Sequence, residues 1–264
     1  MILATNGIIA SQIVSVDPDW LAYYNRVIAA GGSLTTTEQS ATLQLVLDLK
    51  ANSLWTPMKA IYPMVGASAA ACAQNLKSSS FTGVFNGGVT FSSTGVLGNG
   101  TTGYMNSQLI PSGNVGQDDA HLCVYSRSNI TTSSIVDIGC LNAQRFYIIS
   151  NFGGASYVSL NGLGDPAGTT MTDTRGLIVS TRINSTTVKM YRNGSVQSTV
   201  TQVSTGVNTV QPVYVGAYNN SGSASFFSSR EYAFASIGLG LTDTQASNFY
   251  TAVQAFQTTL SRNV

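Results

Sequence analysis

Apolar residues near the N-terminus recur at helical spacing in two short stretches. Asp17-Pro18 is typical of an N-cap followed by the first helical position, and the run WLAYYNRVIAA ends at Gly31-Gly32, a usual helix stop. Thr35 and Glu38 match a capping box, after which apolar residues again repeat with helical period. The pattern therefore predicts a helical hairpin over residues 17–56, packed on the domain that follows.

From about Met58 to Leu241 the pattern changes to short runs rich in β-branched and aromatic residues, separated by Gly, Asn and Ser. The runs that predict strands are KAIYPMVG, GVTFSS, GYMNSQL, AHLCVYSR, SIVDIGCL, RFYIISNF, SYVSLNG, GLIVSTRI, TVKMYRNG, VYVGAY and EYAFASIGLG. In TTVKMYRNGSVQSTV two alternating segments flank Asn193-Gly194, which favours a type I′ hairpin. So many short strands predict two packed sheets.

Thr242 and Gln245 form another capping box, and the residues after them carry one apolar stripe typical of a helix packed on a sheet. We therefore expect an all-β fold, an antiparallel jelly-roll sandwich over residues 57–264 closed by this C-terminal helix. Residues 1–16 precede the first helix signal and are expected to form an extended arm that contacts neighbours in an assembly.

Composition excludes several classes of function. Only 9% of the residues are charged and the net charge is +1, so no basic stripe is available to neutralise phosphates, and we expect no nucleic-acid partner. No apolar run approaches the roughly 20 residues of a membrane-spanning helix, so we expect no membrane insertion. The N-terminus shows no basic leader and no clear cleavage site, so it does not indicate a signal peptide. The three cysteines, Cys72, Cys123 and Cys140, form no CxxC pair and are expected to be free, mostly buried thiols, which favours synthesis in a reducing cytoplasm.

The sequence holds few groups that do catalytic chemistry. Glu38 and Glu231 are the two glutamates, and the aspartates 118, 119 and 137 are loose candidates for the paired carboxylates that a glycosidase needs. His121, the single histidine, lies two residues before Cys123, but a half-buried histidine beside a core thiol is the preferred interpretation. We expect no enzyme.

Two kinds of ligand site are compatible with the loops. Calcium needs oxygen ligands, and NGLGDPAGTTMTD supplies Asn161, Asp165 and Asp173; no other cofactor is expected. Sugars pack their C–H faces on aromatic rings and bond their hydroxyls to amides. The residues that suit a glycan are Phe152, Tyr157, Asn161, Tyr218 and Asn219. The alternative is that these rings fill the inner faces of the sheets and that the polar residues belong to ordinary turns.

The C-terminal third also carries a family resemblance. The stretches MYRNGSVQSTVTQV, VYVGAYNNSGSASFF and EYAFASIGLGLTDTQASNFYTAVQAFQTTL, with YYNRVIAAGG, LQLVLDLKANSLW and AIYPMVG near the front, resemble the concanavalin A-like, laminin-G-like modules of tailed-phage virion proteins. The resemblance implies a sandwich of two antiparallel sheets and a place on a virus particle, as a head fibre, decoration protein, tail component or receptor-binding element.

Two main hypotheses about function follow from these observations. The first is a non-enzymatic virion structural protein, anchored to other virion proteins through residues 1–16 and forming a homo-oligomer, plausibly a trimer. The second is a carbohydrate-binding module that recognises a host-surface glycan. A polysaccharide-degrading enzyme stays a third, weaker alternative, because the sequence has few acidic residues that could act as catalytic acid and base.

Overall fold

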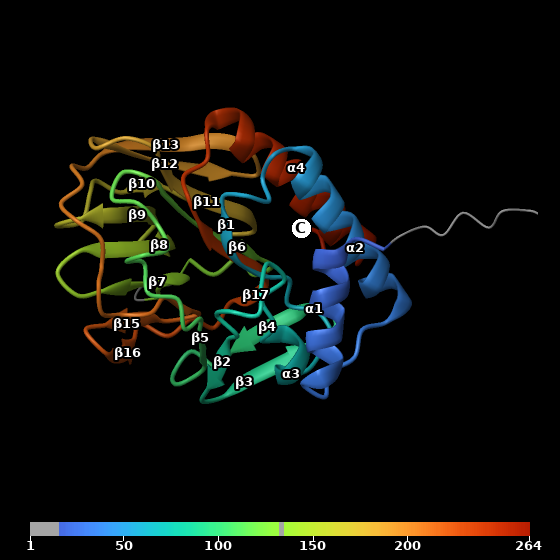
Figure 1. The fold of residues 1–264 in the computed structure, drawn as a ribbon. Coiled ribbons are helices and arrows are strands. Elements are labelled where there is room, and N and C mark those ends of the chain that lie inside the picture. The colour runs from blue at the N-terminus through green and yellow to red at the C-terminus, as the bar shows by residue number, and fades with distance from the viewer. Residues whose placement is uncertain (1–15, 132–134) are drawn as a thin grey trace, which may run out of the picture.

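The fold is an antiparallel β-sandwich of two sheets, with helices packed against one side (Figure 1). The computed structural model describes residues 16–131 and 135–264. The predicted sandwich is therefore confirmed. Residues 1–15 of the predicted arm lie outside the described residues.

The first sheet runs in the order β13, β12, β11, β6, β17, β4, β3, with β1 also paired to β17. Its strands are β13 Ser195–Thr201, β12 Thr187–Arg192, β11 Gly176–Arg182, β6 Ala120–Ser126, β17 Glu231–Gly238, β4 Gly95–Gly98, β3 Val89–Ser92 and β1 Met58–Tyr62. The Asn193-Gly194 hairpin joins β12 to β13 as predicted, and its two central residues have φ of 49° and 76°.

The second sheet runs in the order β10, β9, β8, β7, β14, β5, β2, with the β15–β16 hairpin attached beside β7. Its strands are β10 Thr169–Thr170, β9 Ala155–Gly162, β8 Arg145–Phe152, β7 Ile138–Leu141, β14 Tyr214–Val215, β5 Tyr104–Asn106, β2 Val84–Asn86, β15 Tyr218–Asn220 and β16 Ser223–Ser225. VYVGAY is not one strand, because Gly216 adopts a φ of 80° and divides it into β14 and β15. Its second part then pairs in parallel with β7.

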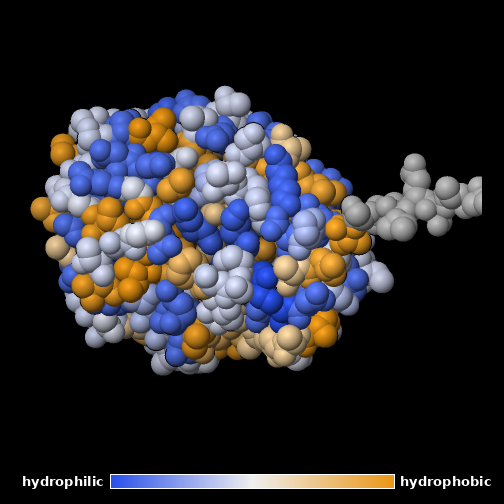
Figure 2. Space-filling view, in the orientation of Figure 1, coloured by the Kyte–Doolittle hydropathy of each residue, from blue (hydrophilic) through white to orange (hydrophobic). Residues whose placement is uncertain are grey.

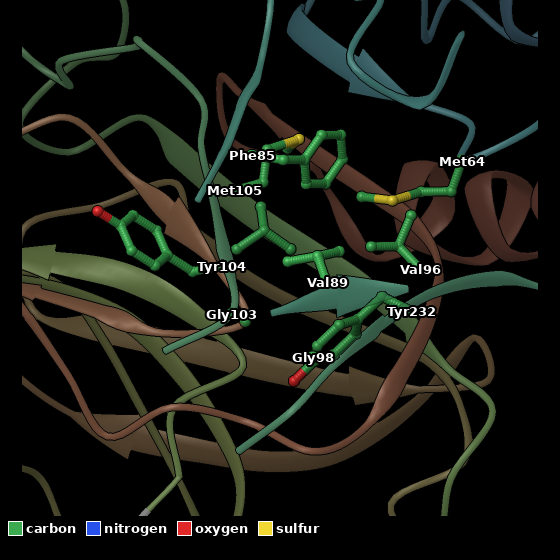
Figure 3. A pocket seen from close by; sticks show the side chains of 11 residues that line it. Met64, Phe85, Val89, Val96, Gly98, Gly103, Tyr104, Met105 and Tyr232 are labelled. Carbon is green, nitrogen blue, oxygen red and sulfur yellow. The ribbon is translucent and has the colours of Figure 1, made fainter. Parts of the chain in front are cut away.

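Strand periodicity divides the apolar residues between two layers. On β6, Leu122 and Val124 point into the core between the sheets, whereas Cys123 and Tyr125 point outward to the helices. Phe146 and Ile148 of β8 enter the inter-sheet core from the opposite side. The gap left in this core near β2, β4 and β5 is about 10 Å³, room for one water at most (Figure 3).

Helices cover the outer face of the first sheet. They are α1 Pro18–Ala29, α2 Thr36–Ala51 and α4 Asp243–Thr259, with the short α3 Ala69–Cys72 beside α1. The N-cap at Asp17 and both predicted capping boxes are present. Apolar side chains of α1, α2 and α4 form one cluster with outward residues of β6, β11 and β17. In Figure 1 these helices lie on the right, and β7, β8 and β9 lie at the far left.

The C-terminus is held to the fold by a buried arginine. Arg262 is fully buried, and its guanidinium donates hydrogen bonds to the carbonyl oxygens of Pro63, Met64 and Ala233 at 2.6 to 2.8 Å. These bonds satisfy the charged group where water is excluded. No helix within residues 16–131 and 135–264 has the length and apolar character needed to span a membrane.

Candidate ligand-binding pocket

The outer face of the second sheet carries a pocket of about 400 Å³, formed by β7, β8, β9 and the β15–β16 hairpin. Its floor consists of Leu141 from β7, Tyr147 and Ile149 from β8, and Tyr157 from β9. These residues point outward because Phe146 and Ile148, which alternate with them on β8, are used by the inter-sheet core. Figure 2 shows apolar groups among polar ones on the side where Figure 1 places these strands.

Two glycines make room for the tyrosines of the floor. Gly139 of β7 is the register partner of Tyr147, and a Cβ at residue 139 would lie 2.5 Å from the Tyr147 Cβ. A Cβ at Gly168 would lie 2.6 Å from the ring of Tyr157. Both distances are below any normal contact, so each tyrosine rests on a position that only glycine can occupy without a shift of its neighbours.

Side chains from outside the strands β7 to β9, most of them aromatic or apolar, form one wall. The wall consists of Ile135 and Val136, which precede β7, together with Tyr218, Asn220 and Phe226 around the β15–β16 hairpin. The ring of Tyr218 stands at 89° to that of Tyr147, with the centroids 5.8 Å apart. Such edge-to-face contacts are favourable and hold both rings in place.

The inner end of the pocket is polar. Arg145 forms an ion pair with Asp165, and the Tyr147 hydroxyl donates a hydrogen bond to the same carboxylate. The side chains of Arg145 and Asp165 are 30% and 52% exposed, so both are accessible from solvent. Burial would raise the pKa of Asp165, but the hydrogen bonds from Arg145 and Tyr147 outweigh it and lower the pKa. Burial, with Asp165 nearby, raises the pKa of Tyr147, which keeps this hydroxyl a neutral donor.

The outer end of the pocket is aromatic. Phe152 is 40% exposed, and its ring lies edge-on to Tyr157 with the centroids 6.3 Å apart. Phe152 and Tyr147 are five positions apart, which in a regular strand would put them on opposite faces. A bulge in β8 between Ile149 and Phe152 shifts the phase, and Phe152 lines the same pocket.

Three of the five residues predicted to suit a glycan line this pocket: Phe152, Tyr157 and Tyr218. Asn161 and Asn219 are buried and engaged inside the fold. The Asn161 amide donates to the carbonyl oxygens of Gly116 and Gln117, and the Asn219 amide donates to that of Pro212. The binding role of all five stays a prediction.

The three residues predicted to hold calcium are separated by the fold. Asp165 pairs with Arg145 at the start of β8, and Asn161 is turned toward Gly116 and Gln117. Asp173 pairs with Arg175 and Arg192, and the hydrogen bond to Arg175 is the main reason why its pKa falls to about 2. Within the described ranges no three His, Cys, Asp or Glu side chains form a group that could hold a metal ion.

The aspartates and the histidine that were candidates for catalysis do not line the pocket, and they form hydrogen bonds within the fold. Asp118 accepts a hydrogen bond from the Ser204 hydroxyl, and Asp119 accepts one from the Gly240 backbone at 2.6 Å. His121 is fully buried with its ring nitrogens 2.6 Å from the Leu239 carbonyl and 3.1 Å from the Ser236 hydroxyl. The three cysteines are buried free thiols, as the sequence predicted, and burial raises the pKa of each, to about 12 for Cys72.

Sequence reasoning missed several pocket residues, notably Arg145, Tyr147, Asn220 and Phe226. A signal for two of them was present in RFYIISNF, where residues 145, 147 and 149 share one face of a strand that was already predicted. No comparable signal marks Phe226, which reaches the pocket from a loop.

No protein-family model matches the chain, and no curated protein sequence matches it. Solved structures resemble its fold. The binding domain of Paraclostridial Mosquitocidal Protein 1 has a TM-score of 0.50 at 10% identity, over 75% of this chain and 53% of that one. The Botulinum neurotoxin serotype D binding domain has a TM-score of 0.52 at 9% identity, over 75% and 51%.

A mutant of Trypanosoma rangeli sialidase with trans-sialidase activity has a TM-score of 0.51 at 10% identity, over 83% of this chain and 39% of that one. The chain thus spans about half the length of the two binding domains and less of the sialidase. At these identities the likeness concerns the fold: the chain has the lectin-like β-sandwich architecture found in these proteins.

Proposed function

We propose that the protein is a non-enzymatic recognition module that binds carbohydrate in the pocket on the second sheet. The observation that carries the proposal is the combination, on a face that none of the described helices covers, of several aromatic rings with the accessible Arg145–Asp165 pair. Aromatic rings pack on the C–H face of a sugar, and a charged donor and acceptor side by side bond its hydroxyls.

The chemistry of the pocket favours binding over catalysis. Among the residues that line it in the described part of the chain, Asp165 is the one carboxylate, and it is held by Arg145 and Tyr147. Hydrolysis of a glycosidic bond normally needs two carboxyl groups in different protonation states. The lowered pKa of Asp165 also makes it a poor proton donor near neutral pH.

The architecture is compatible with this role. Two of the similar structures, from Paraclostridial Mosquitocidal Protein 1 and from Botulinum neurotoxin serotype D, are described as binding domains. Fold alone does not assign a ligand, and the site residues therefore carry the proposal.

The test is a glycan-array screen of the purified protein, repeated with calcium and with a chelator. We expect reproducible binding that is lost in Tyr157→Ala and weakened about tenfold in Phe152→Ala, since each change removes a ring that packs on the ligand. Tyr24→Ala is the matched control, because Tyr24 is a half-buried tyrosine on α1, on the other side of the sandwich. Binding that survives both pocket substitutions, or no binding by folded protein, would contradict the proposal.

We also propose the virion as the place where this module works. The support is the resemblance of the C-terminal third and the helical front to phage virion modules, together with a surface in which neutral polar residues outnumber charged ones. In this proposal residues 1–16 anchor the module to other virion proteins and the protein forms a homo-oligomer. Analytical ultracentrifugation tests the oligomer, and unchanged particle incorporation after deletion of residues 1–16 would refute the anchoring.

A further inference from the structure

The pocket is elongated along β8. Arg145 at the first residue of this strand and Phe152 at the last both line it. At about 3.3 Å per residue, seven steps correspond to roughly 20 Å between the two ends. A volume of about 400 Å³ also falls within the range of sites that enclose ligands larger than a single sugar ring.

We propose that this pocket binds an uncharged oligosaccharide of at least two sugar units, which lies along β8 from the Arg145–Asp165 pair to Phe152. The inference rests on the proposed carbohydrate-binding function and specifies its substrate class. Each end of the pocket supplies a different kind of contact, so the two ends are separable by mutation.

The charges of the inner end select against acidic sugars. Arg145 and Asp165 are the charged residues that line the pocket within the described ranges, and they neutralise each other. The pair offers both donors and acceptors, which matches neighbouring sugar hydroxyls. A sugar carboxylate would compete with Asp165 for the Arg145 guanidinium while it is repelled by the Asp165 carboxylate.

The outer end offers stacking without charge. Phe152 exposes 40% of its surface, and Tyr157 supports it edge-on from β9. The β8 bulge that brings Phe152 to this face makes the aromatic surface continuous with the floor at Ile149 and Tyr157. A second or third sugar unit reaches this end, whereas a single unit held at Asp165 does not.

The test is isothermal titration with cello-, malto-, xylo- and arabino-oligosaccharides of one to five units, and with galacturonate oligomers as acidic probes. We expect the affinity for the preferred neutral series to rise by roughly three- to tenfold between one and three units. Phe152→Ala should abolish this rise, so that oligomers bind no more tightly than the single unit does. Asp165→Asn should weaken neutral ligands of every length and bind galacturonate oligomers more tightly than the unmodified protein, because it leaves Arg145 without its counter-ion.

The outcomes separate the two proposals. Neutral sugars that bind with the same affinity at every length would overturn the extended site and leave carbohydrate binding intact. Galacturonate oligomers preferred by the unmodified protein would overturn the uncharged substrate class. Silence toward all sugars, with binding of short aromatic peptides in their place, would overturn the proposed function itself. Circular dichroism and thermal unfolding of each variant, with Tyr24→Ala as the control, show that the effects do not come from misfolding.

Discussion

Asp137 is a buried carboxylate that joins the two sheets, and its replacement by asparagine should destabilise the protein strongly. Asp137 and Arg230 are both fully buried, and their charged groups lie 2.9 Å apart. The carboxylate also accepts hydrogen bonds from the Tyr232 hydroxyl at 2.7 Å, and from the backbone and hydroxyl of Ser150 at 2.6 and 2.7 Å. Arg230 comes just before β17 of the first sheet and Ser150 from β8 of the second, so the cluster connects both layers.

The expected loss is about 3–5 kcal/mol in the free energy of unfolding. Asp137→Asn keeps the shape of the side chain but leaves the buried Arg230 charge without a counter-ion, and breaking one partner of a buried pair typically costs this much. In the variant the amide NH₂ group replaces a carboxylate oxygen that accepted hydrogen bonds, so two donors face each other and one hydrogen bond is lost. Replacing Arg230 by methionine in the same chain removes the unpaired charge, so the double variant should recover much of the loss.

The measurement is urea unfolding at pH 7, followed by far-ultraviolet circular dichroism and by tyrosine fluorescence. Asp165→Asn is the matched control, because its ion pair with Arg145 is half exposed and should contribute no more than about 1 kcal/mol. A loss below about 1 kcal/mol for Asp137→Asn would refute the reasoning. So would a double variant that is no more stable than the single one.

Three further predictions concern single sites. Burial lowers the pKa of His121 to about 4, compared with 6.5 for an exposed histidine. The neutral, buried imidazole therefore contributes its full share to the free energy of unfolding above about pH 6.5. This share declines by up to about 3 kcal/mol as the pH falls to 4, because the unfolded chain binds a proton there more readily than the folded one. Urea unfolding at pH 7 and 4.5 measures the decline, and a His121→Gln variant with the same decline would show another cause. Gly139→Ala should cost about 1–3 kcal/mol and reduce ligand affinity, since the new Cβ displaces Tyr147; thermal unfolding and glycan titration check both effects. Thr242→Ala should cost about 0.5–2 kcal/mol because it removes the α4 capping box, and a melting temperature that does not change would count against this role.

The elements that the sequence predicted well are those with local causes. Asp17, Thr35 and Thr242 begin helices because their side-chain oxygens accept backbone hydrogen bonds a few residues along the same chain. Asn193-Gly194 forms its turn because both residues tolerate positive φ. Such signals need no knowledge of the rest of the molecule.

The candidate site was predictable in part. Aromatic residues next to loop residues suit sugars, which predicts Phe152, Tyr157 and Tyr218, and all three line one pocket. The same reasoning predicts Asn161 and Asn219, but their amides donate hydrogen bonds to backbone carbonyls within the fold. An amide in a loop satisfies either a ligand or the backbone, and the choice depends on neighbours that are distant in sequence.

The sequence by itself determined the class of the fold, the helix caps and the alternation of apolar residues along each strand, because these follow from interactions over a few residues. Tertiary structure alone decided which face of the sandwich the described helices cover and which face carries the pocket. It also brought Arg145 to Asp165 and, through a bulge in β8, turned Phe152 toward Tyr157. These contacts depend on strand register and sheet packing, which are set by the burial of the whole core.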